Sequence, residues 1–125
     1  MISILIVEDD PEAIEAFALI LKVEGYAVRT ARDAPSALAE LAREAPSAVV
    51  LDLQLPVGSG LEVLRQLRTM PGLADVPVAV VTGNYMLDEG AARELKTLGA
   101  TLYFKPVWGE DLVRIVRTLV GDTAP

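Results

Sequence analysis

The sequence predicts an α/β fold in which helices cover both faces of a five-stranded parallel sheet. Short apolar runs alternate strictly with helix-like stretches along the chain. The runs are nearly continuous in aliphatic residues, which is typical of parallel strands buried on both faces. A length of 125 residues, with no internal repeat or linker, suits one domain of this kind. We therefore expect residues 1–125 to form a single three-layer, doubly wound domain.

The chain begins with an aliphatic strand, which we expect at residues 2–7. A helix is expected at residues 11–24. Asp10 can cap its first turn, Pro11 suits its first position, and Gly25 can end it. The first strand and the first helix are thus separated by a short acidic turn.

The next elements are an outer strand, a helix and a third strand. Residues 26–30 alternate more between polar and apolar side chains, as expected at the outside of a sheet. Asp33 and Pro35 open a helix at residues 34–44. Residues 48–52 are apolar up to a final aspartate and form the third expected strand.

The second half of the chain repeats the strand and helix pattern. Leu61, Leu64 and Leu67 recur at helical spacing and mark the inner face of a helix. The expected elements are a helix at 61–69, a strand at 76–81, a helix at 88–98, a strand at 100–104 and a helix at 110–120.

The order of the strands does not follow from this pattern alone. The flavodoxin-like order 2-1-3-4-5 places the first and third strands side by side at the topological switch point. Ligands of such sheets bind beyond the carboxyl ends of the strands. In that order Glu8 and Asp9 would lie next to Asp52.

Composition excludes several classes of function. The chain has no cysteine and no histidine, which excludes thiolate sites, histidine-based zinc sites and Ser-His-Asp hydrolases. Its net charge of −7 gives no basic footprint for direct nucleic-acid binding. The apolar runs are too short to span a membrane, and the first residues lack the basic region of a signal peptide. We expect a cytoplasmic domain that does not contact a membrane.

Four strands end on polar residues that suit phosphate chemistry, namely Glu8, Asp9, Asp52, Thr82 and Lys105. Two carboxylates about 4 Å apart repel by roughly 4 kcal/mol at an effective dielectric constant near 20. Such a site must bind a proton or a cation, and an oxygen-only ligand set favours Mg²⁺ or Mn²⁺. Asp10, by contrast, is expected only as a helix cap.

A carboxylate at such a site can act as a nucleophile toward a phosphoryl group. We expect Asp52 to be that nucleophile, since it ends the central strand and precedes an open loop. Thr82 would donate a hydrogen bond to the phosphoryl group, and Lys105 would offset its negative charge.

The ordered motifs closely resemble the receiver domain of two-component response regulators, the chemotaxis-Y-like family. The resemblance covers essentially the whole chain. It rests on Ile-Leu-Ile-Val-Glu-Asp-Asp-Pro at 4–11, Pro-Ser-Ala-Val-Val-Leu-Asp-Leu at 46–53, Pro56, Gly60, Val-Val-Thr at 80–82 and Tyr-Phe-Lys-Pro at 103–106.

The resemblance implies a role for each site residue. Asp52 would accept a phosphoryl group from a histidine kinase, a histidine phosphotransfer protein or a small phosphodonor. Asp9, Asp52 and the backbone carbonyl of Gln54 would bind Mg²⁺ directly, and Glu8 would act through water. Thr82 and Lys105 would hold the phosphoryl group.

The family also implies a conformational response. Tyr103 matches the switch aromatic, which turns inward when the threonine moves toward the phosphate. The change is read on the face formed by the fourth helix, the fifth strand and the last helix, and the protein is a monomer or a phosphorylation-dependent dimer. The bond between Lys105 and Pro106 is often cis in the family. Gly83 departs from the usual alanine or serine, and Asn84 occupies a position that tunes hydrolysis.

Other interpretations remain open from sequence. A metal-dependent aspartyl-phosphate phosphatase or phosphotransferase would need a second acid where this chain has Gln54. A scaffold that only binds partners would not need Asp52. Trp108, Val113 and Val120 either mark a surface for the unknown output partner or complete the core.

Overall fold

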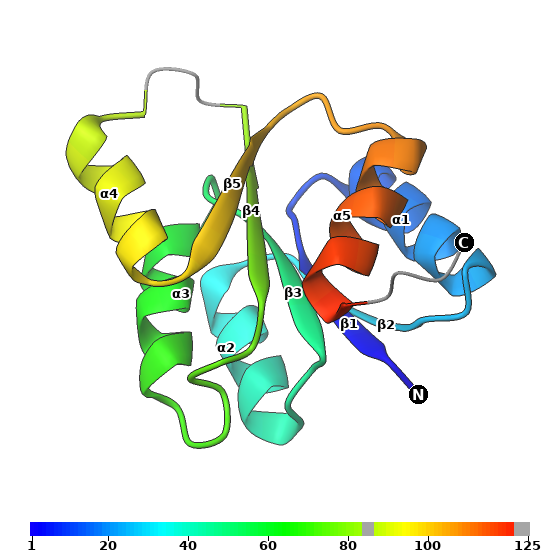
Figure 1. The fold of residues 1–125 in the computed structure, drawn as a ribbon, viewed down its shortest axis with the longest axis horizontal. Helices are drawn as coiled ribbons and strands as arrows, with labels where there is room; N and C mark the ends of the chain where they lie inside the picture. The colour runs from blue at the N-terminus through cyan, green and yellow to red at the C-terminus, as the bar shows by residue number, and fades with distance from the viewer. Residues whose placement is uncertain (84–86, 122–125) are drawn as a thin grey trace.

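The computed structural model describes residues 1–83 and 87–121, and it contains the expected parallel sheet (Figure 1). The strand order is β2-β1-β3-β4-β5, and each neighbouring pair is parallel. The strands are β1 (Ser3–Val7), β2 (Ala27–Ala31), β3 (Ala48–Asp52), β4 (Val78–Thr82) and β5 (Ala100–Phe104). The prediction of a flavodoxin-like sheet is therefore confirmed.

Five helices cover the two faces of the sheet. They are α1 (Pro11–Val23), α2 (Ala34–Arg43), α3 (Gly60–Thr69), α4 (Glu89–Thr97) and α5 (Gly109–Val120). In Figure 1, α1 and α5 lie on one side of the sheet, and α2, α3 and α4 lie on the other. None of the helices in the described part of the chain has the length and apolar character of a membrane span.

The alternation of side chains along each strand divides the core into two halves. In β1, Leu5 and Val7 face the cluster formed with α2, α3 and α4, while Ile4 and Ile6 face the cluster formed with α1 and α5. β3 and β4 are buried at all their positions, whereas the outer strands β2 and β5 are partly exposed. Packing on both faces therefore fixes the carboxyl ends of the central strands, and with them the positions of the residues that follow.

Polar side chains start four of the helices. Asp10 caps α1 by accepting a hydrogen bond from the backbone of Glu12, which confirms its expected role. Asp33, Ser59 and Asp88 cap α2, α3 and α4 in the same way. At α5 the capping position is occupied by Trp108, whose side chain makes no capping bond.

The fourth strand differs from the expected range at both ends. Strand β4 covers Val78–Thr82 rather than residues 76–81. The backbone N–H of Val76 bonds to the carbonyl of Leu73 in a turn, and Pro77 has no N–H to offer. Each of these residues delays the start of the strand. Every other element end coincides with the expected range or differs from it by a single residue.

The three residues that either mark a partner surface or complete the core have different environments. Trp108 is 68% exposed and so does not complete the core, while its role in a partner surface stays a prediction. Val120 is half-buried and packs on the core cluster of α1 and α5, and Val113 is also half-buried.

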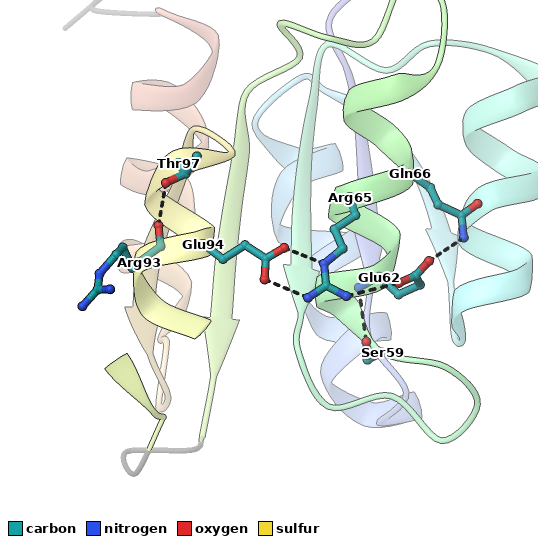
Figure 2. A network of polar contacts seen from close by, with 7 residues as sticks. All are labelled: Ser59, Glu62, Arg65, Gln66, Arg93, Glu94 and Thr97. Carbon is teal, nitrogen blue, oxygen red and sulfur yellow. Dashed lines mark hydrogen bonds and ion pairs between the residues drawn. The ribbon is translucent and has the colours of Figure 1, made fainter. Parts of the chain in front are cut away.

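A polar contact joins α3 to α4. Figure 2 shows the guanidinium of Arg65 on α3 facing the carboxylate of Glu94 on α4 through two nitrogen atoms. Glu62, one turn earlier on α3, also pairs with Arg65. Nearby, Arg68 donates to the carbonyl of Leu98 at the end of α4, at 2.7 Å. These polar contacts hold α4 against α3. They act together with the packing of Leu95, the buried residue of α4 in the described structure.

Gly60 permits a close backbone approach next to the end of β3. A Cβ atom at this position would lie 2.7 Å from the Cα of Leu53 and 2.9 Å from the carbonyl carbon of Asp52. Both are backbone atoms of the segment that positions Asp52, so neither can move without displacing the loop.

We expect Gly60→Ala to destabilise the fold by about 1–3 kcal/mol, the usual cost of overpacking. Urea unfolding followed by circular dichroism measures this change. Gly83→Ala is the matched control, because a Cβ there would meet no atom closer than 4.0 Å. Equal unfolding midpoints for the two variants would contradict the packing argument.

Candidate functional site

The carboxyl edge of the sheet brings the acidic residues together. β1 and β3 are neighbours, with Val7 paired to Leu51, so Glu8 and Asp52 come next on adjacent strands. One carboxylate oxygen from each of Glu8, Asp9 and Asp52 lies within 4.8 Å of the other two. The strand order thus assembles the acidic cluster that the sequence indicated.

Lys105 reaches this cluster from the end of β5. Its Nζ donates to Glu8 Oε1 and to Asp52 Oδ2, both at 2.9 Å. Its backbone N–H also bonds to the carbonyl of Thr82, at 2.8 Å, and its peptide bond to Pro106 is cis. One ammonium group therefore bridges two carboxylates that come from different strands.

Burial makes the electrostatics of this cluster strong. Glu8 is 4% exposed and Asp52 is 5% exposed. The pKa of Glu8 is raised from 4.5 to about 7, first because burial disfavours its charged form and second because Asp52 lies beside it. Lys105 acts on Glu8 in the opposite direction but does not outweigh these causes. Near neutral pH, Glu8 therefore holds a proton for part of the time.

The pKa of Asp52 is shifted in the opposite direction to that of Glu8. Burial alone would raise its pKa, but hydrogen bonds with Glu8, with Lys105 and with the backbone N–H of Gln54 outweigh burial and lower the pKa. The bond from Gln54 to Asp52 Oδ1 is 2.9 Å long. The pKa of Lys105 is raised, since its two carboxylate partners outweigh the effect of burial. The cluster thus contains an ionised aspartate paired with a cation.

The oxygen atoms present fit a hard divalent cation. Glu8 Oε2 is buried and has no hydrogen-bond partner among the described residues, so its site can accept one more cation or donor. Asp9 is half-buried at the mouth of the cluster. Three carboxylates without nitrogen or sulfur ligands suit Mg²⁺ or Mn²⁺. The Gln54 carbonyl as a fourth ligand stays a prediction.

The two expected switch residues lie at the ends of the neighbouring strands. Thr82 is the last residue of β4, is fully buried and follows Val81, which pairs with Asp52. Tyr103 on β5 is half-buried and lines a pocket of about 450 Å³ together with Ile115 of α5. Their roles as switch residues stay predictions, and Asn84 lies outside the described residues.

Two contacts at the site were not foreseen from sequence. Lys105 pairs with Glu8 as well as with Asp52. Arg32, which follows β2, donates from Nη2 to the backbone carbonyl of Asp9 at 3.1 Å. The position of Arg32 one residue beyond a strand end was the available signal, but the direction of a long exposed side chain does not follow from sequence.

Together, the fold and the site define an α/β domain with an acidic cluster at its topological switch point. The response regulator receiver domain model matches residues 4–117. The chain is 37% identical over 123 residues to the probable transcriptional regulatory protein TcrX of Mycobacterium tuberculosis, covering 98% of this chain and 51% of TcrX. It therefore spans about half the length of the curated relatives it matches.

Solved structures of the same family are similar over nearly the whole chain. A CheY-like receiver domain protein from Methanospirillum hungatei has a TM-score of 0.88 and 27% identity, with 98% of this chain and 95% of that chain covered. The receiver domain of sensor histidine kinase PA1611 from Pseudomonas aeruginosa, with magnesium in its active-site cleft, has a TM-score of 0.83 and 28% identity, with 95% and 97% covered.

This chain belongs to the response regulator receiver domain family, whose members are phosphoryl-accepting switches of two-component systems. Receiver domains interact with histidine kinases. The match does not favour the alternative interpretations as a phosphatase, a phosphotransferase or a scaffold.

Proposed function

We propose that Asp52 accepts the phosphoryl group, from the phosphohistidine of a kinase or phosphotransfer protein or from a small phosphodonor. A carboxylate oxygen of Asp52 attacks phosphorus while the bond from phosphorus to the donor's imidazole nitrogen breaks, and the electron pair of that bond stays with the imidazole. The phosphohistidine lies outside residues 1–125, because none of these residues is a histidine.

The observation that carries this proposal is the difference between the two buried carboxyls. Both contact the same ammonium group at 2.9 Å, yet the pKa of Asp52 is lowered while that of Glu8 is raised to about 7. Asp52 is therefore the ionised group at neutral pH and the better nucleophile. Glu8 is left as the group that exchanges its proton for a metal.

We propose that Asp9, Asp52 and the Gln54 carbonyl hold Mg²⁺ or Mn²⁺, with Glu8 acting through water. When bound, the metal would neutralise charge on the phosphoryl oxygens. The magnesium in the PA1611 receiver domain and the acidic cluster of this chain support the assignment.

Metal binding should depend on pH through Glu8. The metal favours the Glu8 carboxylate, so the proton must leave, and Mg²⁺ affinity should rise with pH and fall by up to about tenfold per unit below pH 7. Titration calorimetry at several pH values measures the affinity, and buffers of different ionisation enthalpy count the released protons. Glu8→Gln should remove this dependence near neutrality, and an unchanged slope in that variant would assign the proton to another group.

We propose that Thr82 and Tyr103 transmit phosphorylation to the face formed by α4, β5 and α5. Thr82 lies between the strand that carries Asp52 and the strand that carries Tyr103, and the pocket beside Tyr103 leaves its ring room to move. A change of this kind selects between two arrangements that already exist in equilibrium.

Thr82→Val keeps the volume of the side chain and removes its hydroxyl. Phosphoryl uptake should persist in this variant, while the response of the Tyr103 ring to beryllofluoride, measured by NMR, should disappear. Thr97→Val is the control, since that hydroxyl bonds to the carbonyl of Arg93 away from the site (Figure 2). A normal Tyr103 response in Thr82→Val would refute the proposed coupling.

For the whole protein, we propose a cytoplasmic response regulator in which residues 1–125 form one receiver domain. Its output partner is not specified by the residues described, and activation would act on a monomer or drive dimerisation. Sedimentation with and without beryllofluoride distinguishes these two modes.

A further inference from the structure

One short segment of the chain contacts both of the loops that carry the expected metal ligands. It consists of the two residues between β2 and α2 and the first residue of α2. Nη2 of Arg32 donates to the backbone carbonyl of Asp9 at 3.1 Å. Two residues later, the backbone N–H of Ala34 donates to the carbonyl of Val57, also at 3.1 Å. This segment therefore links the turn after β1 to the loop after β3.

The start of α2 holds the segment in place. The hydroxyl of Ser36 accepts hydrogen bonds from the backbone N–H groups of Arg32 and Asp33, both at 3.3 Å. The carboxylate of Asp33 in turn accepts from the backbone N–H of Ser36 at 2.8 Å. Ala34 is buried, and a Cβ atom on Gly58 would lie only 2.5 Å from its Cβ. The loop after β3 therefore packs directly on the segment, and the backbone of Arg32 has a fixed position.

Asp9 lies between two residues that other contacts already fix. The backbone N–H of Glu8 bonds to the carbonyl of Ala31 at 3.0 Å, and the carboxylate of Asp10 caps α1. The carbonyl of Asp9 accepts its hydrogen bond from Arg32. This bond sets the orientation of the peptide plane between Asp9 and Asp10, and with it the direction in which the Asp9 side chain leaves the turn.

We propose that Arg32 is a positioning residue for the metal, because its bond to Asp9 fixes the separation of Asp9 from the carbonyl of Gln54. The inference rests on the proposed function, in which these two groups and Asp52 hold Mg²⁺ or Mn²⁺. The loop that carries Gln54 is anchored separately, since the N–H of Gln54 bonds to Asp52 at 2.9 Å. Arg32 does not bind the metal itself and acts through Asp9.

The expected consequence is selectivity between cations of the same charge and different size. Mg²⁺ needs nearly ideal octahedral geometry at about 2.0–2.1 Å, whereas Ca²⁺ accepts more oxygen atoms in flexible arrangements at about 2.3–2.6 Å. Loosening the turn at Asp9 should therefore weaken the binding of Mg²⁺ more than that of Ca²⁺. The positive charge of Arg32 opposes both divalent ions alike, so the effect of removing it cancels in the ratio of the two affinities.

Arg32→Met removes the hydrogen-bond donor and leaves an apolar side chain. NMR titrations of wild type and variant with MgCl₂ and with CaCl₂, followed at the amide signals of Asp9 and Gln54, give the two dissociation constants. The ratio of Mg²⁺ affinity to Ca²⁺ affinity should fall about threefold to tenfold, the usual effect of one hydrogen bond. Arg32→Lys keeps the charge and a donor, so it should restore most of the wild-type ratio.

Arg43→Met is the matched control, because Arg43 is the last residue of α2, pairs with Glu40 of the same helix, and should leave the ratio unchanged. An unchanged ratio in Arg32→Met, an equal fall in Arg43→Met, or no recovery in Arg32→Lys would overturn the role of Arg32. A large fall in the melting temperature of metal-free Arg32→Met would also overturn it, because the contact would then serve the stability of the fold.

Failure of the proposed metal site would look different from failure of this inference. If wild type binds neither cation, or if Asp52→Asn binds Mg²⁺ as tightly as wild type does, the metal site itself is wrong. If wild type binds Mg²⁺ through Asp52 and the ratio in Arg32→Met is unchanged, the site stands and only the positioning role of Arg32 is lost.

Discussion

Replacing Asp52 by asparagine is expected to abolish covalent phosphorylation by acetyl phosphate in the presence of Mg²⁺. An amide has no anionic oxygen to attack phosphorus, and Glu8, the other buried carboxyl of the cluster, does not match Asp52. Glu8 has a raised pKa, while Asp52 is ionised and held by Lys105 and by the N–H of Gln54. Intact-protein mass spectrometry measures the adduct.

The same substitution has a second consequence that can be checked. Because Asp52 is one of the causes of the raised pKa of Glu8, that pKa should fall toward its ordinary value in Asp52→Asn. NMR titration of the Glu8 carboxyl follows this change. Asp10→Asn is the control for the chemical substitution itself, since Asn caps a helix as well as Asp and phosphorylation should continue. A full adduct on Asp52→Asn would show that another residue carries the phosphoryl group.

Removing the ammonium group of Lys105 is expected to have the next largest effect. In Lys105→Met the side chain keeps an unbranched apolar stem but has no ammonium group to pair with Asp52 or Glu8. The rate of phosphorylation should fall by about 10²-fold, the typical cost of losing one group that stabilises developing charge. Intact-protein mass spectrometry of samples quenched at successive times, at saturating Mg²⁺, gives this rate.

The affinity of Lys105→Met for Mg²⁺, unlike its rate of phosphorylation, should not fall. The ammonium group and the metal compete for the same carboxylates, so Mg²⁺ should bind Lys105→Met at least as tightly as wild type. Lys22→Met removes an exposed lysine from the last turn of α1 and should alter neither quantity. A wild-type rate in Lys105→Met would mean that this ammonium group takes no part in the reaction.

Much of the fold was predictable because burial leaves a clear pattern in parallel strands. β3 and β4 are apolar before their last residues and buried throughout, and the sequence shows this directly. The carboxylates at the strand ends were predictable for the same reason, because a strand end fixes the position of the next side chain. Strand order came from the resemblance and from the flavodoxin-like precedent, not from periodicity.

The remaining features depend on distances that a sequence does not contain. The start of β4 was wrong because a turn bond from Val76 competes with the strand. The bridge from Lys105 to Glu8 depends on the reach of one flexible side chain across the sheet. The raised pKa of Glu8 depends on how deeply it is buried, and the exposure of Trp108 depends on the angle at which α5 begins. These distances, burial depths and angles are determined by the packing of the three layers, which a sequence does not show.

The central claim is that Asp52 forms an acyl phosphate, and chemical trapping tests it most directly. Borohydride reduces an aspartyl phosphate to homoserine, so peptide mapping after treatment with acetyl phosphate, Mg²⁺ and borohydride identifies the modified residue. Our account predicts homoserine at position 52, in proportion to the adduct and dependent on the metal. Homoserine at another position, or a stable phosphate on a hydroxyl group with position 52 unchanged, would contradict it.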